Sequence, residues 1–109
     1  MVTVPFSDFQ KLDLRVGEIK KVEDVEGYDK LYKISVDLGE LGERILIAGI
    51  KLWYTKEALI GLQVVVVVNL QPKRLAGLDS QGMLLAADVD GRAVLVMPCD
   101  KVSPGTKVR

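Results

Sequence analysis

Two apolar runs with a polar segment between them dominate the hydrophobic pattern of the chain. Five consecutive valines, Val64–Val68, predict a strand buried on both faces, because a strand with one solvated face alternates apolar and polar residues. The second run, MLLAA at Met83–Ala87, predicts a buried neighbouring strand. The interval between the runs is polar and basic, and a loop held between two buried strands is a natural place for a binding surface.

The chain before these runs predicts three strands. Residues 15–24 are expected to form a long first strand with a bend or bulge at Gly17. The alternation places Leu14, Val16 and Val22 on one face of this segment. Gly17 and Ile19 fall on the other face. Residues 31–38 alternate cleanly and predict a half-buried antiparallel strand with Tyr32 on its core side. The turn GELGE joins this strand in a hairpin to a third strand at residues 44–50.

Capping and turn signals predict two short helices and another hairpin. The opening PFSDFQKLDL favours about one helical turn with Ser7 or Asp8 as its N-cap, and TKEALIG favours a second helix with Thr55 as its N-cap. Asp90-Gly91 favours a type I′ turn between strands at 84–89 and 93–97. The surrounding DVDG lacks the other ligands of a calcium loop, so we interpret it as this turn.

Three strands, a short helix and then two or more strands is the order of an all-β OB-fold. That fold is a five-stranded Greek-key barrel, and the helix would lie between its third and fourth strands. Periodicity alone leaves an SH3-like barrel or another small β-barrel as alternatives.

Length and charge limit what the chain can bind. Its 109 residues predict one domain spanning residues 1–109. Fifteen basic residues balance fifteen acidic ones, so the molecule lacks the overall positive field of an avid, nonspecific nucleic-acid binder. Any contact with RNA must therefore rest on a local basic patch, with a modest affinity that falls as salt rises.

Several enzyme classes are excluded as they are conventionally built. The chain has no histidine, the usual base of Ser-His and Cys-His chemistry and the commonest zinc ligand. No acid/base, metal-ligand, P-loop or dinucleotide motif is present, so we expect no catalytic residue, metal or cofactor. The single Cys99, the polar start and the lack of an apolar stretch of roughly 20 residues predict a cytoplasmic protein without a membrane span.

A family resemblance covers nearly the whole chain. NLQPKRLAGLDSQGMLLAA, from Asn69, resembles the signature of the tRNA-binding domain appended to methionyl-tRNA synthetases. The same domain occurs as a free-standing tRNA-binding protein and in the precursor of the endothelial monocyte-activating polypeptide. Further matching segments follow the family's order: KLDLRVGEI, DKLYKISVDLGE, RILIAGI and PGTKV. The family's His-Pro segment is absent, and Val25–Tyr28 stand in its place.

The resemblance implies a tRNA-facing role for the loop after the valine run. Lys73 and Arg74 are an adjacent basic pair that can meet two phosphates. Asn69 either presents its amide to RNA or ties the loop to a neighbouring strand through backbone hydrogen bonds.

Ser80, Gln81 and Met83 match the next part of the signature. Ser80 and Gln81 can hydrogen-bond to sugar, phosphate or a base edge, and Met83 can meet a base face. Alternatively, Ser80 caps the local turn, Gln81 is solvated and Met83 begins a core strand. Arg15, in the LDLRVG match, either adds to a positive face or pairs with an acidic neighbour.

Exposed aromatic rings are expected to be scarce. Tyr32 is predicted to be in the core, and Trp53 and Tyr54 are predicted to pack at the end of the barrel. Because generic single-strand binders expose aromatic platforms, this scarcity favours recognition of folded RNA shape.

The resemblance implies an OB-fold with additional C-terminal strands and a non-enzymatic module. It would support a methionyl-tRNA synthetase catalytic part, in cis or in trans, by shape- and phosphate-directed tRNA binding. Related domains are homodimers, and we assign the dimer contact to Val4–Leu12 and Val102–Val108. The domain also resembles a bacterial export chaperone, so holding of extended polypeptide is an alternative. A dimerisation appendage without RNA contact is a third interpretation.

Overall fold

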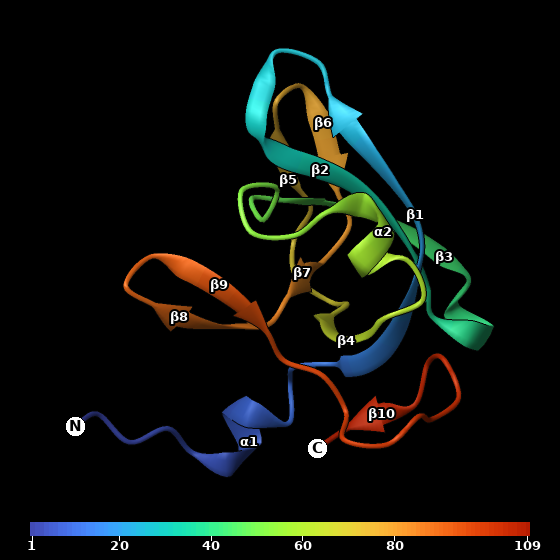
Figure 1. Cartoon of the computed structure of the whole chain (residues 1–109). Helices are drawn as coiled ribbons and strands as arrows, with labels where there is room; N and C mark the ends of the chain where they lie inside the picture. The colour runs from blue at the N-terminus through green and yellow to red at the C-terminus, as the bar shows by residue number, and fades with distance from the viewer.

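The computed structural model describes residues 1–109, and strands make up most of its ordered elements (Figure 1). In chain order the elements are α1 (Phe6–Phe9), β1 (Leu14–Val25), β2 (Tyr28–Asp37), the 3₁₀ turn η1 (Gly39–Leu41), β3 (Glu43–Ala48), α2 (Lys56–Leu59), β4 (Gln63–Val67), β5 (Lys73–Leu75), β6 (Leu78–Ser80), β7 (Met83–Leu84), β8 (Ala86–Val89), β9 (Arg92–Leu95) and β10 (Lys107–Val108). The main sheet has the order β3-β2-β1-β4-β7, with β10 paired to β1. The β5–β6 and β8–β9 hairpins form separate two-stranded sheets.

Strand β1 is central to the main sheet, since it pairs with β2, β4 and β10. Its register with β2 shifts between Ile19 and Lys21, so the irregularity is not at Gly17, where the sequence predicted it. Because of this shift Ile19 and Val22 belong to the same core cluster, and the prediction that they lie on opposite faces was wrong. Gly17 instead permits close packing, because a Cβ there would overlap a side chain of β2.

The valine run forms β4, and both of its faces are buried as predicted. Alternate valines face the main core. Val65 and Val67 pack on the other face in a second cluster with Leu14, against which Leu85 and Val108 also pack. The segment after β7 and the C-terminal strand therefore cover a face that would otherwise be solvated.

The β2–β3 hairpin, α2 and the β8–β9 hairpin also confirm their predictions. Tyr32 lies in the core with 4% of its surface exposed. Thr55 caps α2, because its Oγ1 accepts a hydrogen bond from Ala58 N at 3.2 Å. Asp90 and Gly91 have φ angles of 51° and 86°, as a type I′ turn requires at both central positions.

Helix α1 begins differently from the prediction. It starts at Phe6 with Pro5 as its N-cap residue and no side-chain cap, so Ser7 and Asp8 lie inside the helix. Pro5 holds φ at −59° and its carbonyl accepts a hydrogen bond from Asp8 N at 2.9 Å. No residue of α1 is buried, and none of the helices has the length and apolar composition to span a bilayer.

The free edge of β3 meets the segment between β6 and β7, which curls the sheet into a barrel-like OB-type fold. Gln81 N donates to Ile45 O at 2.9 Å, and Ile45 N donates to Gln81 Oε1 at 2.9 Å. A side chain thus supplies part of the hydrogen bonding that a continuous backbone ladder would supply. The predicted OB-type architecture, with a short helix between the third and fourth strands and extra C-terminal strands, is confirmed.

The predicted strand MLLAA is divided in the structure. Met83–Leu84 form β7 and pair with β4, whereas Ala86 begins β8 and pairs with β9. Met83 is 49% exposed and Leu84 is only partly buried, so the prediction of a second buried strand was wrong. Met83, Leu84 and Ala86 of this run border a groove on the surface, whereas Leu85 packs against the second core cluster.

Candidate nucleic-acid interface

The loop between β4 and β7 contains a hairpin that the sequence did not predict. Residues Lys73–Leu75 pair with Leu78–Ser80. At the turn Ala76 has φ 52° and Gly77 has φ 75°, both in the left-handed region. Alanine is rare in that conformation, so the Ala-Gly pair is a far weaker turn signal than Asp90-Gly91. Figure 1 shows this hairpin at the same end of the molecule as the β1–β2 turn.

The register of this hairpin separates Lys73 from Arg74. Neighbouring residues of a strand point to opposite faces, and Lys73 lies opposite Ser80 whereas Arg74 lies opposite Asp79. Arg74 Nη1 lies 3.2 Å from Asp79 Oδ1. Lys73 is exposed and enters no ion pair. The structure therefore brings the predicted basic pair onto one hairpin but not onto one face.

Asn69 ties the start of the loop to the N-terminal segment. Its Oδ1 accepts a hydrogen bond from Asp13 N at 2.8 Å, and its Nδ2 donates to Lys11 O at 2.6 Å. Of the two roles expected for this amide, the structure shows the tie to a neighbouring segment.

Ser80 and Gln81 anchor the other end of the loop to β3. Ser80 is 5% exposed, and its Oγ accepts from Ile47 N at 3.0 Å and donates to Gly82 O at 3.1 Å. Gln81 is exposed, but its Oε1 is bonded to Ile45 N. Both side chains hold the hairpin in place: the Ser80 hydroxyl and the Gln81 carbonyl are bonded within the chain, while the exposed Gln81 Nε2 makes no hydrogen bond.

Arg44 is a residue of the site that sequence reasoning missed. Its Nη1 donates to Val68 O at 2.9 Å and to Gln81 O at 3.2 Å, so one guanidinium joins both ends of the loop. Nothing in the sequence around Arg44 predicts this role. The role becomes visible only in the folded chain, because Val68 and Gln81 are distant from Arg44 in the sequence.

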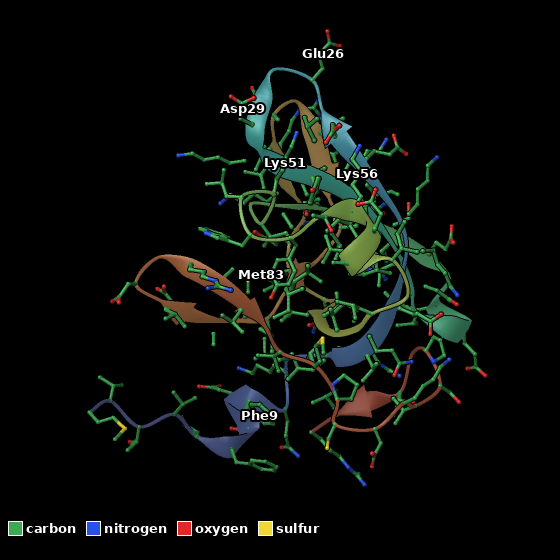
Figure 2. The ribbon with its side chains drawn as sticks, in the orientation of Figure 1. Phe9, Glu26, Asp29, Lys51, Lys56 and Met83 are labelled. Carbon is green, nitrogen blue, oxygen red and sulfur yellow. The ribbon has the colours of Figure 1, made fainter.

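An apolar groove of about 610 Å³ lies beside the basic hairpin. Its walls come from β3 and the loop that follows, the β5–β6 hairpin, β7 and the β8–β9 hairpin. Figure 2 shows Met83 between the β8–β9 hairpin and the loop after β3. Lys73 is the only charged residue that lines the groove. Of the predicted site residues, Lys73, Ser80 and Met83 therefore share one concave surface.

Three other basic residues, Lys51, Lys56 and Arg15, are held by acidic partners. Asp24 accepts from Lys56 at 2.8 Å and lies 3.0 Å from Lys51, and these two ammonium groups, Lys56 first, lower the pKa of Asp24. Arg15 donates to Asp13 at 2.6 Å, which raises the pKa of Arg15. Arg15 thus pairs with an acidic neighbour, the second of its two expected roles.

The aromatic residues divide between packing and partial exposure. Tyr54 packs against the core, and its hydroxyl accepts from Leu95 N at 3.1 Å while its carbonyl accepts from Tyr32 Oη at 2.8 Å. Trp53 is 36% exposed, so it is less fully packed than the sequence predicted. Phe6, Phe9 and Tyr28 are exposed by 70%, 40% and 47%, so the expectation that exposed aromatic rings are scarce was wrong.

The fold and site together define an OB-type module with an anchored basic hairpin beside an apolar groove. The family model described as "Putative tRNA binding domain" matches residues 14–107. Since this match includes nearly the whole chain, the chain belongs to that family.

Its relatives include larger proteins. The methionine–tRNA ligase of Pyrococcus abyssi (strain GE5 / Orsay) is 55% identical over 106 residues, which are 97% of this chain and 14% of the ligase. The methionine–tRNA ligase of Pyrococcus furiosus is 51% identical over 110 residues, which are 100% of this chain and 15% of the ligase. The chain thus spans about one seventh of these relatives, at 14% and 15% of their lengths.

Solved structures of similar size share the fold. The MetRS-related protein from Pyrococcus horikoshii has a TM-score of 0.92 at 35% identity and is covered over 100% of both chains. The chaperone CsaA from Bacillus anthracis has a TM-score of 0.90 at 37% identity, with 99% of this chain and 100% of that chain covered.

Proposed function

We propose that residues 1–109 act as one non-enzymatic domain that binds tRNA. The observation that carries the proposal is the family match across the loop whose hairpin presents Lys73 beside the groove. Unpaired surface lysines bind phosphates, and such contacts position a protein on RNA without reading its sequence. The formal net charge of zero then leaves affinity dependent on this local surface.

The six predicted site residues divide into two proposed roles. Lys73 and Met83 contact RNA directly, and Arg74 contributes a second phosphate contact when RNA replaces Asp79 as its partner. Asn69, Ser80 and Gln81 are positioning residues, because their side chains bond to the N-terminal segment and to β3.

The similarity to ligases supports a role in translation. We infer that the module serves the catalytic part of a methionyl-tRNA synthetase, in cis or in trans, in the cytoplasm. Tethering would turn weak tRNA binding by the module into a gain in the effective tRNA affinity of the whole assembly. The module itself supplies no chemical step.

A homodimer is the second part of the proposal. Val4, Phe6 and Phe9 of the N-terminal segment are exposed by 67%, 70% and 40%, and no residue of α1 is buried. Phe6 and Phe9 share a surface hollow with Val108, so the N-terminal and C-terminal segments assigned to the dimer lie together. A second copy of the chain would cover this apolar surface.

The β8–β9 hairpin adds a further exposed apolar surface to the proposed interface. Val89 and Val94 of the hairpin and Met97, two residues after β9, are exposed by 53%, 38% and 49%. Figure 1 shows this hairpin projecting clear of the sheet, on the same side as the N-terminal segment. The sequence assigned no dimer contact to these residues.

A salt-titrated binding assay tests tRNA recognition, with total tRNA and an unstructured RNA of equal length as competitors. Preference for tRNA supports the proposal, and Lys73→Ala is expected to weaken binding and to reduce the salt slope by about one. Arg74→Ala should weaken binding less, because Asp79 already occupies its guanidinium. Lys21→Ala, an exposed and paired lysine of β1, serves as the matched control. Equal affinity for both RNAs would contradict the proposal.

The likeness to the chaperone CsaA supports a second candidate function, in which the groove or the apolar surfaces hold polypeptide. This function predicts binding that is indifferent to salt and to Lys73→Ala, because it depends on apolar surface. The same titration with an unfolded protein in place of RNA separates the two functions.

A further inference from the structure

We propose that the groove binds one unstacked nucleotide, with the base between the apolar walls and the phosphate on Lys73. The inference deepens the proposed tRNA-binding function and rests on it. It assigns a ligand to a surface that phosphate contacts alone do not explain.

The size and lining of the groove suit a base. Its volume of about 610 Å³ lies within the range of roughly 300–1,000 Å³ that is usual for small-ligand sites. Eleven of its sixteen lining residues are hydrophobic, so a base can bury its faces there. Leu70 and Met83 are exposed by 41% and 49%, and they offer aliphatic and thioether surface to a base face.

A small number of vacant polar groups accompany the apolar walls. Lys73 supplies a positive charge for a phosphate. Gln71 lines the groove, is exposed and makes no side-chain hydrogen bond within the chain, so its amide can both donate to and accept from a base edge. Gly49 N, just after β3, also donates no hydrogen bond. These groups match a nucleotide, which is an anion with an apolar face and a polar edge.

Charge and the state of the β3 edge disfavour an extended polypeptide as the occupant. A peptide that joins a sheet edge needs a succession of free backbone groups along the edge strand. On β3 the amides of Ile45 and Ile47 are already bonded to Gln81 and Ser80, which leaves Gly49 N beyond the end of the strand. No acidic residue lines the groove, so an anionic ligand meets no repulsion there.

The first test is a methyl and amide NMR titration of the 109-residue chain with the four nucleoside monophosphates and with ribose 5-phosphate. Monophosphates should shift the Met83, Ala86 and Ala93 methyl signals and the Gly49 amide, whereas ribose 5-phosphate should leave these groove signals in place. An apolar decapeptide is titrated in parallel. Shifts of the groove signals by the peptide and not by the monophosphates would overturn the proposal in favour of a polypeptide site.

The second test fills the groove without changing charge. Ala86 is exposed and lines the groove, so Ala86→Phe occupies the site from a position that tolerates a larger side chain. Loss of one base contact is expected to weaken tRNA binding about tenfold while leaving the salt slope unchanged, since no phosphate contact is lost. Ala58→Phe, at an exposed position of α2 outside the groove, adds the same side chain as a control and should bind like the unchanged chain.

Failure of this inference can be told apart from failure of the proposed function. If the unchanged chain prefers tRNA, Ala86→Phe binds tRNA as tightly, and no monophosphate shifts the groove signals, then the nucleotide site is refuted while tRNA binding stands. If monophosphates shift the groove signals but the chain shows no tRNA preference, the nucleotide site stands and the tRNA function fails.

Discussion

The two small hairpins of this molecule, β5–β6 and β8–β9, use the same kind of turn for different surfaces. Both have two left-handed residues at the turn, Ala76-Gly77 in one and Asp90-Gly91 in the other. They border the same groove, with Lys73 and Leu75 on one side and Ala86 and Ala93 on the other.

They differ in how they are attached and in what they expose. The side chains of Ser80 and Gln81 accept hydrogen bonds from two β3 amides and so fasten β5–β6 to the edge of β3, and the hairpin exposes Lys73 and Arg74 on its two faces. The β8–β9 hairpin is held at its base by the buried Leu95. Val89 and Val94 of this hairpin are exposed. A charged hairpin fixed by polar bonds suits a phosphate-rich partner, whereas an apolar hairpin suits another protein surface.

The largest predicted effect concerns the apolar hairpin. The double substitution Val94→Asp/Met97→Asp is expected to weaken the proposed dimer by more than about a hundredfold, because carboxylates buried without partners are strongly unfavourable. Sedimentation equilibrium measures the change, and the monomer should keep its stability to within about 0.5 kcal/mol, as is usual for surface changes. Ala58→Asp, which adds a carboxylate elsewhere on the surface, is the control. If the dimer survives the double substitution, the β8–β9 hairpin is not part of the dimer interface.

The second prediction concerns the fastening of the basic hairpin. Ser80→Ala removes the acceptor of the Ile47 amide from a buried site and should lower the free energy of unfolding by about 1–3 kcal/mol. Hydrogen exchange should become faster at Ile47 and along β5–β6 while β8–β9 keeps its protection. Ser103→Ala, an exposed serine whose side chain makes no hydrogen bond, is the control. Unchanged exchange at Ile47 would show that the backbone alone holds the hairpin.

The third prediction compares the two turns directly. Ala76→Gly should raise the free energy of unfolding by about 1 kcal/mol, because it relieves a side chain held at positive φ. Asp90→Gly should change it less, since aspartate tolerates that region and Asp90 already suits the turn. Thermal unfolding of the two variants checks the difference. An equal response at both turns would mean that Ala76 is no more strained than Asp90.

The smallest predicted effect depends on pH and on the loop that forms one wall of the groove. Lys56 and Lys51 hold the pKa of Asp24 below its ordinary value in the folded chain. The stabilisation is therefore complete above the ordinary carboxyl pKa and is lost as pH falls through the lowered value. The expected change is small because the groups are exposed.

Urea denaturation between pH 6 and about pH 3 measures this loss, and Asp24→Asn should flatten that part of the pH profile. Asp79→Asn provides a comparison, because Asp79 is exposed and pairs with one basic residue, Arg74, whereas Asp24 pairs with two lysines. An identical acid profile for Asp24→Asn and the unchanged chain would rule out a contribution from Asp24.

Local pattern sufficed for most of the strands and for one of the two hairpin turns. Five adjacent valines required cover on both faces, the alternation at residues 31–38 set the inward face of β2, and Asp90-Gly91 marked a turn. Each of these features depends on residues that are close together in the chain, so each is visible in the sequence.

The arrangement of the candidate site depended on contacts between distant residues. Asn69 bonds to Lys11, 58 residues away, and Ser80 bonds to Ile47, 33 residues away. No local pattern shows which distant donor or acceptor a polar side chain will meet, so these side chains looked equally suited to contact RNA. The β5–β6 register then placed Lys73 and Arg74 on opposite faces, since the pleat of a strand separates neighbours that the sequence shows as a pair.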